Sequence, residues 1–130
     1  MKLLLIGSSG FFGQHLTPDL EKNFELYHLQ SNLLEYQKVI DEVTQISPDI
    51  IVHLAARTEV EQSFYEQTVF SEINYVGTIN LIEAAYKVKN LKNFVFASTM
   101  EVYGWQPISD IIRDGKEEGI IAFNEATPPN

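Results

Sequence analysis

Three glycines near the N-terminus have the spacing of a turn that binds phosphate. Gly7, Gly10 and Gly13 are three positions apart and directly follow the apolar segment at residues 2–6. A chain that leaves a strand and enters a helix must turn sharply, which favours a residue without Cβ at Gly7. A dinucleotide diphosphate must approach the backbone closely, which favours Gly10, whereas close packing of the helix on the sheet favours Gly13.

The start of the helix that follows would supply the hydrogen-bond donors for such an anion. The free N–H groups lie near Phe11 and Phe12, where the positive end of a helix dipole attracts negative charge. We expect the two phenyl rings themselves to belong to the core and not to form a stacking platform. A glycine turn that binds no ligand is the alternative.

The elements that must hold this turn alternate between strands and helices. The sequence predicts strands at 2–6, 24–29, 50–54 and 93–98, and helices at about 11–22, 33–46 and 62–89. A continuous apolar run such as 2–6 is typical of a strand buried on both faces. The alternation predicts βαβ units and a parallel sheet. Pro18 costs about 3 kcal/mol inside a helix, so the first helix either kinks there or restarts after Thr17.

Composition excludes several classes of protein. The chain has 130 residues, of which 45% are apolar and 21% charged, as in an ordinary globular domain. It has no cysteine, which excludes disulfides, thiolate metal sites and a cysteine nucleophile. A net charge of −9 argues against binding to nucleic acid or to an anionic membrane surface. The apolar run Leu3–Ile6 is too short for a signal peptide or a membrane span, and we expect a cytoplasmic protein.

Five motifs occur in an order that is typical of one enzyme family. They are Gly7-x-x-Gly10-x-x-Gly13, Asp49–Ala56, Val60–Ser63, Asn74–Thr78 and Phe96–Gly104. Together they resemble the extended short-chain dehydrogenase/reductases, in particular the NAD(P)-dependent sugar-nucleotide epimerase/dehydratase group. The resemblance covers residues 1–104, and Glu125–Pro129 resembles a later Glu-x-x-Pro-Pro segment of that family.

The resemblance implies an α/β fold with a partial Rossmann architecture. We expect a doubly wound parallel sheet with its strands, numbered in chain order, arranged 2-1-3-4. Ligands then bind where the order reverses, between strands 1 and 3. Residues 1–98 would form the dinucleotide-binding domain, and residues 99–130 an active-site loop region and the start of a C-terminal part.

The family pattern also indicates which residues bind the coenzyme. The expected set is Gly7, Gly10, Phe11, Phe12, Gly13, Gln30, Asn32, Leu33, Leu54, Ala55, Ala56 and Asn74. Gln30 ends the second strand, where an acid often binds the ribose hydroxyls, and its amide can still donate and accept there. Ser8, Ser9 and Ser31 nearby are neutral, which favours NAD and leaves NADP open. Asn32 and Leu33 match an adenine contact, with an ordinary polar loop as the alternative.

The catalytic residues are only partly represented. Thr99 matches the family's Ser or Thr beside the substrate oxygen, and a strand-end cap is the alternative. Asn74 matches an Asn that supports the active site, and purely structural hydrogen bonding is the alternative. None of the six tyrosines is followed by Lys four positions later, so the family's Tyr-x-x-x-Lys pair is absent. Tyr103 matches a structural Tyr-Gly of the family, and the expected pair would follow Asn130.

The three histidines and Arg57 are weaker candidates for a functional site. His15, His28 and His53 lack the spacing of metal ligands, so we expect no metal site and assign His53 to the core. Arg57 could meet a phosphate or form an ion pair with Glu59 or Glu61.

The main hypothesis is the NAD(P)-binding portion of an epimerase/dehydratase-like oxidoreductase, inactive alone, whose complete form would act on a nucleotide sugar. A non-catalytic dinucleotide-binding or regulatory module and an inactive truncated product are the alternatives. A homodimer through the helix at 62–89 is one option.

Overall fold

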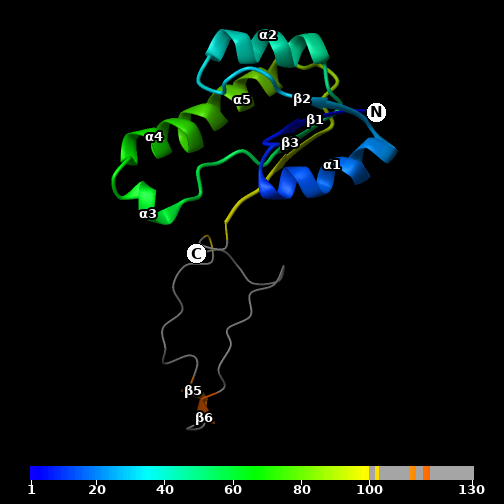
Figure 1. Ribbon diagram of the computed structural model, residues 1–130. Helices are drawn as coiled ribbons and strands as arrows, with labels where there is room; N and C mark the ends of the chain where they lie inside the picture. The colour runs from blue at the N-terminus through cyan, green and yellow to red at the C-terminus, as the bar shows by residue number, and fades with distance from the viewer. Residues whose placement is uncertain (100–101, 103–111, 114–115, 118–130) are drawn as a thin grey trace. The chain divides into compact units, whose positions relative to one another are not determined.

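The computed structural model describes residues 1–99, 102, 112–113 and 116–117 (Figure 1). The chain divides into two compact units, Met1–Ala97 and Ser98–Asn130. The first unit contains a sheet and its helices. In the second, the described residues include one short antiparallel pair, β5 (Ile112–Arg113) and β6 (Lys116–Glu117).

The sheet of the first unit has four parallel strands. They are β1 (Lys2–Ile6), β2 (Glu25–His28), β3 (Ile50–His53) and β4 (Asn93–Phe96). Their order across the sheet is β2-β1-β3-β4, with Leu4 of β1 opposite Tyr27 on one side and Ile51 on the other. The predicted parallel sheet and strand order are therefore confirmed.

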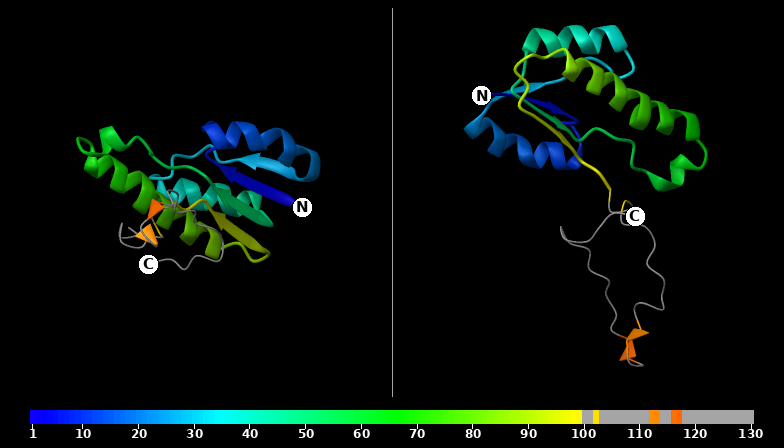
Figure 2. Two further views of the ribbon diagram at one scale, coloured as in Figure 1. Left: turned by 90° about the horizontal axis from the view of Figure 1, so that it is seen from below. Right: turned by 180° about the vertical axis from the view of Figure 1, so that it is seen from behind.

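Helices cover both faces of this sheet. Figures 1 and 2 show α1 (Phe11–Asn23) on one face, with α2 (Tyr36–Ile46) and α5 (Gly77–Tyr86) on the other. Two short helices, α3 (Val60–Ser63) and α4 (Gln67–Ser71), and a π-helical turn, η1 (Glu72–Val76), lead into α5. The arrangement is the doubly wound, partial Rossmann architecture that the sequence predicts.

The pleat of β1 divides its side chains between the two faces. Leu4 and Ile6 join Ile51 in the core beneath α2 and α5, whereas Leu3 and Leu5 point to the α1 face. The helices contribute Val39, Ile40, Val43, Leu81, Ala84, Ala85 and Val88 to the same core. Each large aliphatic side chain buried there stabilises the fold by about 1.5–3 kcal/mol.

The second helix starts later than the periodicity of residues 33–46 predicts. It begins at Tyr36 because Asn32 forms a turn first. The Asn32 Oδ1 accepts the N–H of Leu34 at 3.0 Å, and its carbonyl accepts the N–H of Glu35 at 2.8 Å. An Asn side chain that bonds the backbone two residues on competes with helix formation in this way.

Two other helices differ from expectation. The stretch 62–89 is interrupted, because the chain turns between α3 and α4 and α5 ends at Tyr86. The first helix continues past Pro18 as one element, so of the two alternatives the restart after Thr17 is wrong.

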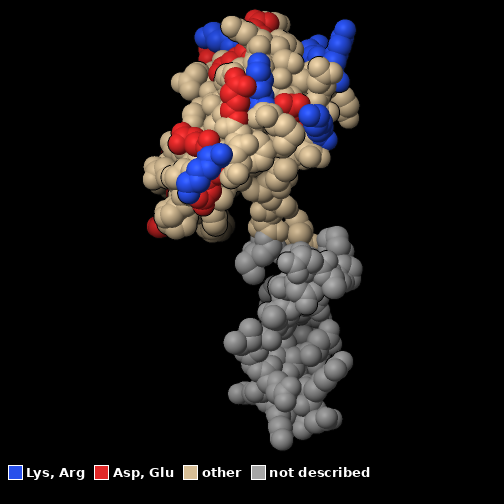
Figure 3. Space-filling model, turned by 90° about the vertical axis from the view of Figure 1, so that its right-hand side faces the viewer, with Lys and Arg blue, Asp and Glu red and all other residues tan. Residues whose placement is uncertain are grey.

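The surface mixes the two signs of charge. On the face drawn in Figure 3, basic and acidic side chains lie beside one another. Such a face presents no extended basic surface to a nucleic-acid backbone. Among the helices of the described residues, none has the length and apolar character that crossing a bilayer requires.

Candidate functional site

The glycine-rich turn packs directly against the segment that follows β3. Gly7 has a φ of +90°, which L side chains rarely adopt. A Cβ placed on Gly7 would lie 2.6 Å from the backbone nitrogen of Ala55 and 2.9 Å from the carbonyl carbon of Leu54. Gly7 therefore sets how closely the turn approaches the end of β3.

Gly13 and Gly10 differ in what surrounds them. A Cβ on Gly13 would lie 2.2 Å from the carbonyl oxygen of Gly7, so only glycine lets α1 pack against the turn. A Cβ on Gly10 would meet only that same oxygen, at an ordinary 3.4 Å. The packing of the protein does not require glycine at position 10. The bare backbone there instead leaves room for a ligand to approach, and a diphosphate fits this requirement.

The first turn of α1 provides donors beside this opening. Gly10 is the N-cap residue, and no side chain caps the helix. The N–H groups of Phe11 and Phe12 belong to the first turn, which has no acceptors within the helix. The Gln14 side chain donates to the Ser9 carbonyl at 2.8 Å and so links α1 to the turn. No sequence motif predicts this bond.

The expectation that both phenyl rings belong to the core is wrong. Phe11 is 72% exposed and Phe12 is 70% exposed. Within α1 only Gly13 is buried. Phe11 instead contacts Phe12 edge to face and the ring of His15, at centroid distances of 5.5 and 4.5 Å.

This turn lies at the reversal point of the sheet. It follows β1, and the chain beyond β3 runs beside it, with the N–H of Leu54 donating to the carbonyl of Ile6 at 2.8 Å. Because β2 lies on one side of β1 and β3 on the other, the connections diverge here (Figure 1). Parallel sheets of this kind bind ligands in that crevice. The predicted residues Leu54, Ala55 and Ala56 lie along it, with Ala56 exposed.

A chain of hydrogen bonds holds the segment after β3. The Asn74 Oδ1 accepts the N–H of Arg57 at 2.7 Å, and its Nδ2 donates to the Arg57 carbonyl at 2.9 Å. Asn74 also accepts the Thr78 hydroxyl at its own carbonyl, at 2.8 Å. Asn74 sits in η1, and π-helical turns are frequent where a fold positions a functional residue.

His53 extends this series of hydrogen bonds into the core. Its Nε2 lies 2.9 Å from the Thr78 hydroxyl. Because that hydroxyl gives its one hydrogen to Asn74, the His53 Nε2 must be the donor. His53 is 1% exposed, as its assignment to the core predicts, and its Nδ1 has no hydrogen-bond partner within the described part of the chain. Burial lowers the pKa of His53 from its ordinary value of 6.5.

The side chain of Arg57 is engaged by groups of its own unit. Its guanidinium donates to Gln62 at 2.9 Å and lies 3.5 Å from a carboxylate oxygen of Glu59 and of Glu66. It also lies 5.4 Å from the ring centroid of Phe70. These contacts favour the ion-pair interpretation, with Glu66 in place of Glu61.

Gln30 lies just beyond the end of β2, the strand that borders β1 on the side away from β3. Its side-chain amide donates to the His28 carbonyl at 3.0 Å. The backbone N–H groups of Gln30 and Ser31 both donate to the carboxylate of Glu42, at 2.7 and 2.8 Å. Glu42 belongs to α2, and no motif in the sequence points to it.

The loop at Asn32 and Leu33 is anchored to α5. Leu33 is only 8% exposed, and its side chain packs against Gly77, where an added Cβ would lie 3.0 Å from the Cβ of Leu33. The buried side chain of Asn80 donates to the Leu33 carbonyl at 2.8 Å. Leu33 is thus a core residue.

Thr99 belongs to the second unit and is exposed. Its carbonyl accepts the N–H of Val102 at 3.3 Å. The catalytic assignment of Thr99 stays a prediction. Tyr103 and the segment Glu125–Pro129 lie outside the described residues. Within the part of the chain that the structure describes, no group of His, Asp and Glu could hold a metal ion.

Comparison with known proteins identifies the family. A model of the NAD dependent epimerase/dehydratase family matches residues 3–120. The chain belongs to this family. The predicted membership in the sugar-nucleotide epimerase/dehydratase group is thereby confirmed, and the glycine turn lies in the matched region.

Individual family members resemble the chain over part of their own length. A dTDP-D-glucose 4,6-dehydratase from Dictyostelium discoideum is 32% identical over 84% of this chain and 31% of its own length. RMD from Pseudomonas aeruginosa, solved in complex with NADPH, has a TM-score of 0.74 at 27% identity, over 99% of this chain and 42% of that one. A UDP-glucose 4-epimerase from Thermus thermophilus, solved in complex with NAD, has a TM-score of 0.75 at 27% identity, over 100% of this chain and 44% of that one. The chain therefore spans less than half the length of these relatives.

Proposed function

We propose that this chain is the NAD(P)-binding portion of a nucleotide-sugar epimerase/dehydratase-like oxidoreductase, and that it binds NAD. The observation that carries the proposal is the space at Gly10, which the packing of the protein does not use, beside the uncapped start of α1. A backbone that is open at this point and followed by free N–H groups suits a diphosphate.

Each residue around the turn would contact a different part of the coenzyme. The N–H groups of Phe11 and Phe12 would hold the diphosphate, Gln30 would bind the adenine ribose, and the Asn32–Leu33 loop would contact the adenine. Leu54–Ala56 would line the opposite wall, held in place by Asn74. The bound nicotinamide would exchange a hydride with a carbon of the sugar, and the Thr99 hydroxyl would hydrogen-bond the substrate oxygen.

We further propose that the chain has no turnover by itself. Its 130 residues contain no Tyr-x-x-x-Lys pair, and loss of a general acid/base costs about 10²–10⁴-fold in rate. The same observation favours a second candidate, a non-catalytic dinucleotide-binding module. We place either form in the cytoplasm.

Binding and turnover experiments test these proposals. A titration of the chain with NADH, followed by the coenzyme's fluorescence, should saturate with one site per chain. Absence of saturable binding would contradict both candidates. Turnover of UDP-glucose or dTDP-glucose by the chain alone would contradict the proposed inactivity. Turnover by a longer form that carries the Tyr–Lys pair would favour the enzyme portion over the non-catalytic module.

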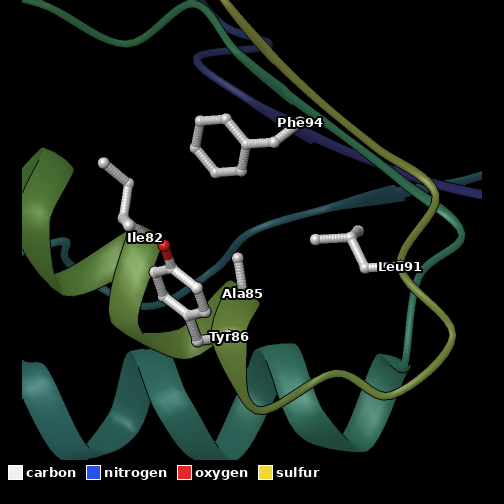
Figure 4. Close-up of a pocket in the computed structure, with 5 residues that line it drawn as sticks. All are labelled: Ile82, Ala85, Tyr86, Leu91 and Phe94. Atoms are coloured by element: carbon white, nitrogen blue, oxygen red, sulfur yellow. The ribbon is translucent and has the colours of Figure 1, made fainter.

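Self-association through the helical stretch that ends in α5 is also proposed. Its exposed apolar side chains are Val60, Phe64, Tyr65, Val69, Tyr75, Val76, Ile82 and Tyr86. Figure 4 shows an apolar hollow of about 350 Å³ between α5 and β4, lined by Ile82, Ala85, Tyr86, Leu91 and Phe94. Sedimentation equilibrium should detect a dimer, and a strictly monomeric chain at high concentration would contradict this proposal.

A further inference from the structure

The loop after β2 is held by a carboxylate from the neighbouring helix. The two oxygens of Glu42 each accept one backbone N–H, Oε1 from Gln30 at 2.7 Å and Oε2 from Ser31 at 2.8 Å. Both donors lie where the adenine ribose would sit in the proposed function. Glu42 therefore uses the two consecutive N–H groups that this loop could otherwise offer to a ligand.

This arrangement bears on the difference between NAD and NADP. The two coenzymes differ at the 2′ position of that ribose, which carries a hydroxyl in NAD and a phosphate in NADP. A phosphate dianion needs N–H donors or a cation at this loop. Here both N–H groups already serve a carboxylate, whose negative charge repels a second anion at close range.

The neighbouring side chains do not offset that charge. Gln30 and Ser31 are neutral, and the Gln30 amide is turned back to the His28 carbonyl. The nearest lysine along α2, Lys38, forms an ion pair with Glu35. A ribose hydroxyl, in contrast, carries no charge and can bond the free part of the Gln30 amide.

We propose that Glu42 is a specificity-determining residue that selects NAD over NADP by occupying the N–H groups of Gln30 and Ser31. The inference rests on the proposed function. The similar structures leave the choice open, because one was solved with NADPH and another with NAD.

Three variants of the full 130-residue chain test the inference. Glu42→Gln removes the charge and one of the two acceptors, and Glu42→Ala frees both N–H groups. Asp41→Asn is the matched control, since Asp41 precedes Glu42 on α2 and its carboxylate accepts the side-chain N–H of Gln37 at 2.8 Å. Dissociation constants for NADH and NADPH are measured by coenzyme fluorescence. Amide hydrogen exchange of Gln30 and Ser31 is measured in the free protein.

The expected result has two parts. The wild-type chain and Asp41→Asn bind NADH more tightly than NADPH and protect both amides. Each Glu42 variant exchanges these amides faster and changes the ratio of the two dissociation constants by about tenfold in favour of NADPH, as expected for one screened like charge. Because the side chain of Glu42 is half-buried and lies outside the hydrophobic core, thermal unfolding should show that all variants remain folded.

The outcomes separate this inference from the proposed function. A wild-type chain that prefers NADPH overturns the inference, and so do Glu42 variants whose amides are freed while the coenzyme ratio stays unchanged. A wild-type chain that binds neither coenzyme overturns the proposed function and the inference together. If every variant binds NADH saturably and keeps the wild-type ratio of the dissociation constants for NADH and NADPH, only the inference is overturned and the proposed function stands.

Discussion

Asn74 holds the backbone of Arg57 from both sides, accepting its N–H at 2.7 Å and donating to its carbonyl at 2.9 Å. The two residues are 17 positions apart in the chain. This pair ties the π-helical turn η1 to the segment that follows β3. Through these two bonds Asn74 supports the crevice from its place in a helical stretch, although it does not itself contact the glycine turn.

Replacing Asn74 should loosen that segment. We expect Asn74→Ala to lower the free energy of unfolding by about 1–3 kcal/mol, because two half-buried backbone groups of Arg57 lose their partners. NADH binding should weaken as well, since Leu54–Ala56 loses its anchor. Urea unfolding and a coenzyme titration measure the two effects. Asn23→Ala, which removes a single exposed bond to the Asp19 carbonyl, is the control and should change stability by at most about 0.5 kcal/mol.

An unchanged unfolding curve for Asn74→Ala would show that the two bonds contribute nothing to the fold. Normal NADH binding by a destabilised variant would restrict Asn74 to a structural role, the alternative that the sequence left open.

Gly13→Ala should damage the fold itself. Its Cβ would lie 2.2 Å from the Gly7 carbonyl oxygen and 2.6 Å from the Cα of Ser8, and neither backbone atom belongs to a flexible side chain. We expect a loss of about 2–3 kcal/mol, the usual cost of overpacking, together with loss of NADH binding. Thermal unfolding measures the first effect. A variant as stable as the wild type would mean that α1 does not pack this closely on the turn.

Acidification should destabilise the protein through His53. Burial lowers its pKa in the folded state below the 6.5 of an exposed imidazole, so the unfolded chain binds a proton first. The contribution of neutral His53 to stability is complete above pH 6.5 and is lost as the pH falls toward the lowered pKa. We expect the free energy of unfolding of His53→Leu to depend less on pH in this window than that of the wild type.

Chemical unfolding of both proteins between pH 5 and 8 measures this difference. His28→Leu, which removes a histidine from strand β2, serves as the control. Parallel curves for the wild type and His53→Leu would contradict the buried, neutral state of His53.

Local pattern was enough to predict the sheet and the turn. The apolar run at 2–6 and the spacing of Gly7, Gly10 and Gly13 are contiguous signals, and the alternation of elements fixes a parallel sheet. The boundaries were less accurate where a side chain competed with the backbone, as Asn32 does ahead of α2. The burial of the phenyl rings was misjudged because hydrophobicity alone does not show which apolar side chains of a helix face the sheet.

Contacts between distant residues could not be predicted. Glu42 lies 12 positions from Gln30 and on a different element, so no spacing rule connects them. The same holds for Asn80, whose side chain reaches the carbonyl of Leu33 47 positions earlier. Such bonds depend on how α2 and α5 pack over the sheet, which a single sequence leaves undetermined.

Binding of the coenzyme diphosphate at the open backbone of Gly10 is the claim that the Gly10→Ala variant tests. With a φ of −75° and a Cβ no closer than 3.4 Å to its neighbour, alanine fits the free protein, and stability should change by at most about 1 kcal/mol. NADH titrations of the wild type and of Gly10→Ala, run beside thermal unfolding, should show saturable binding that weakens by at least about tenfold in the folded variant. Equal affinity of the two proteins for NADH would contradict the claim.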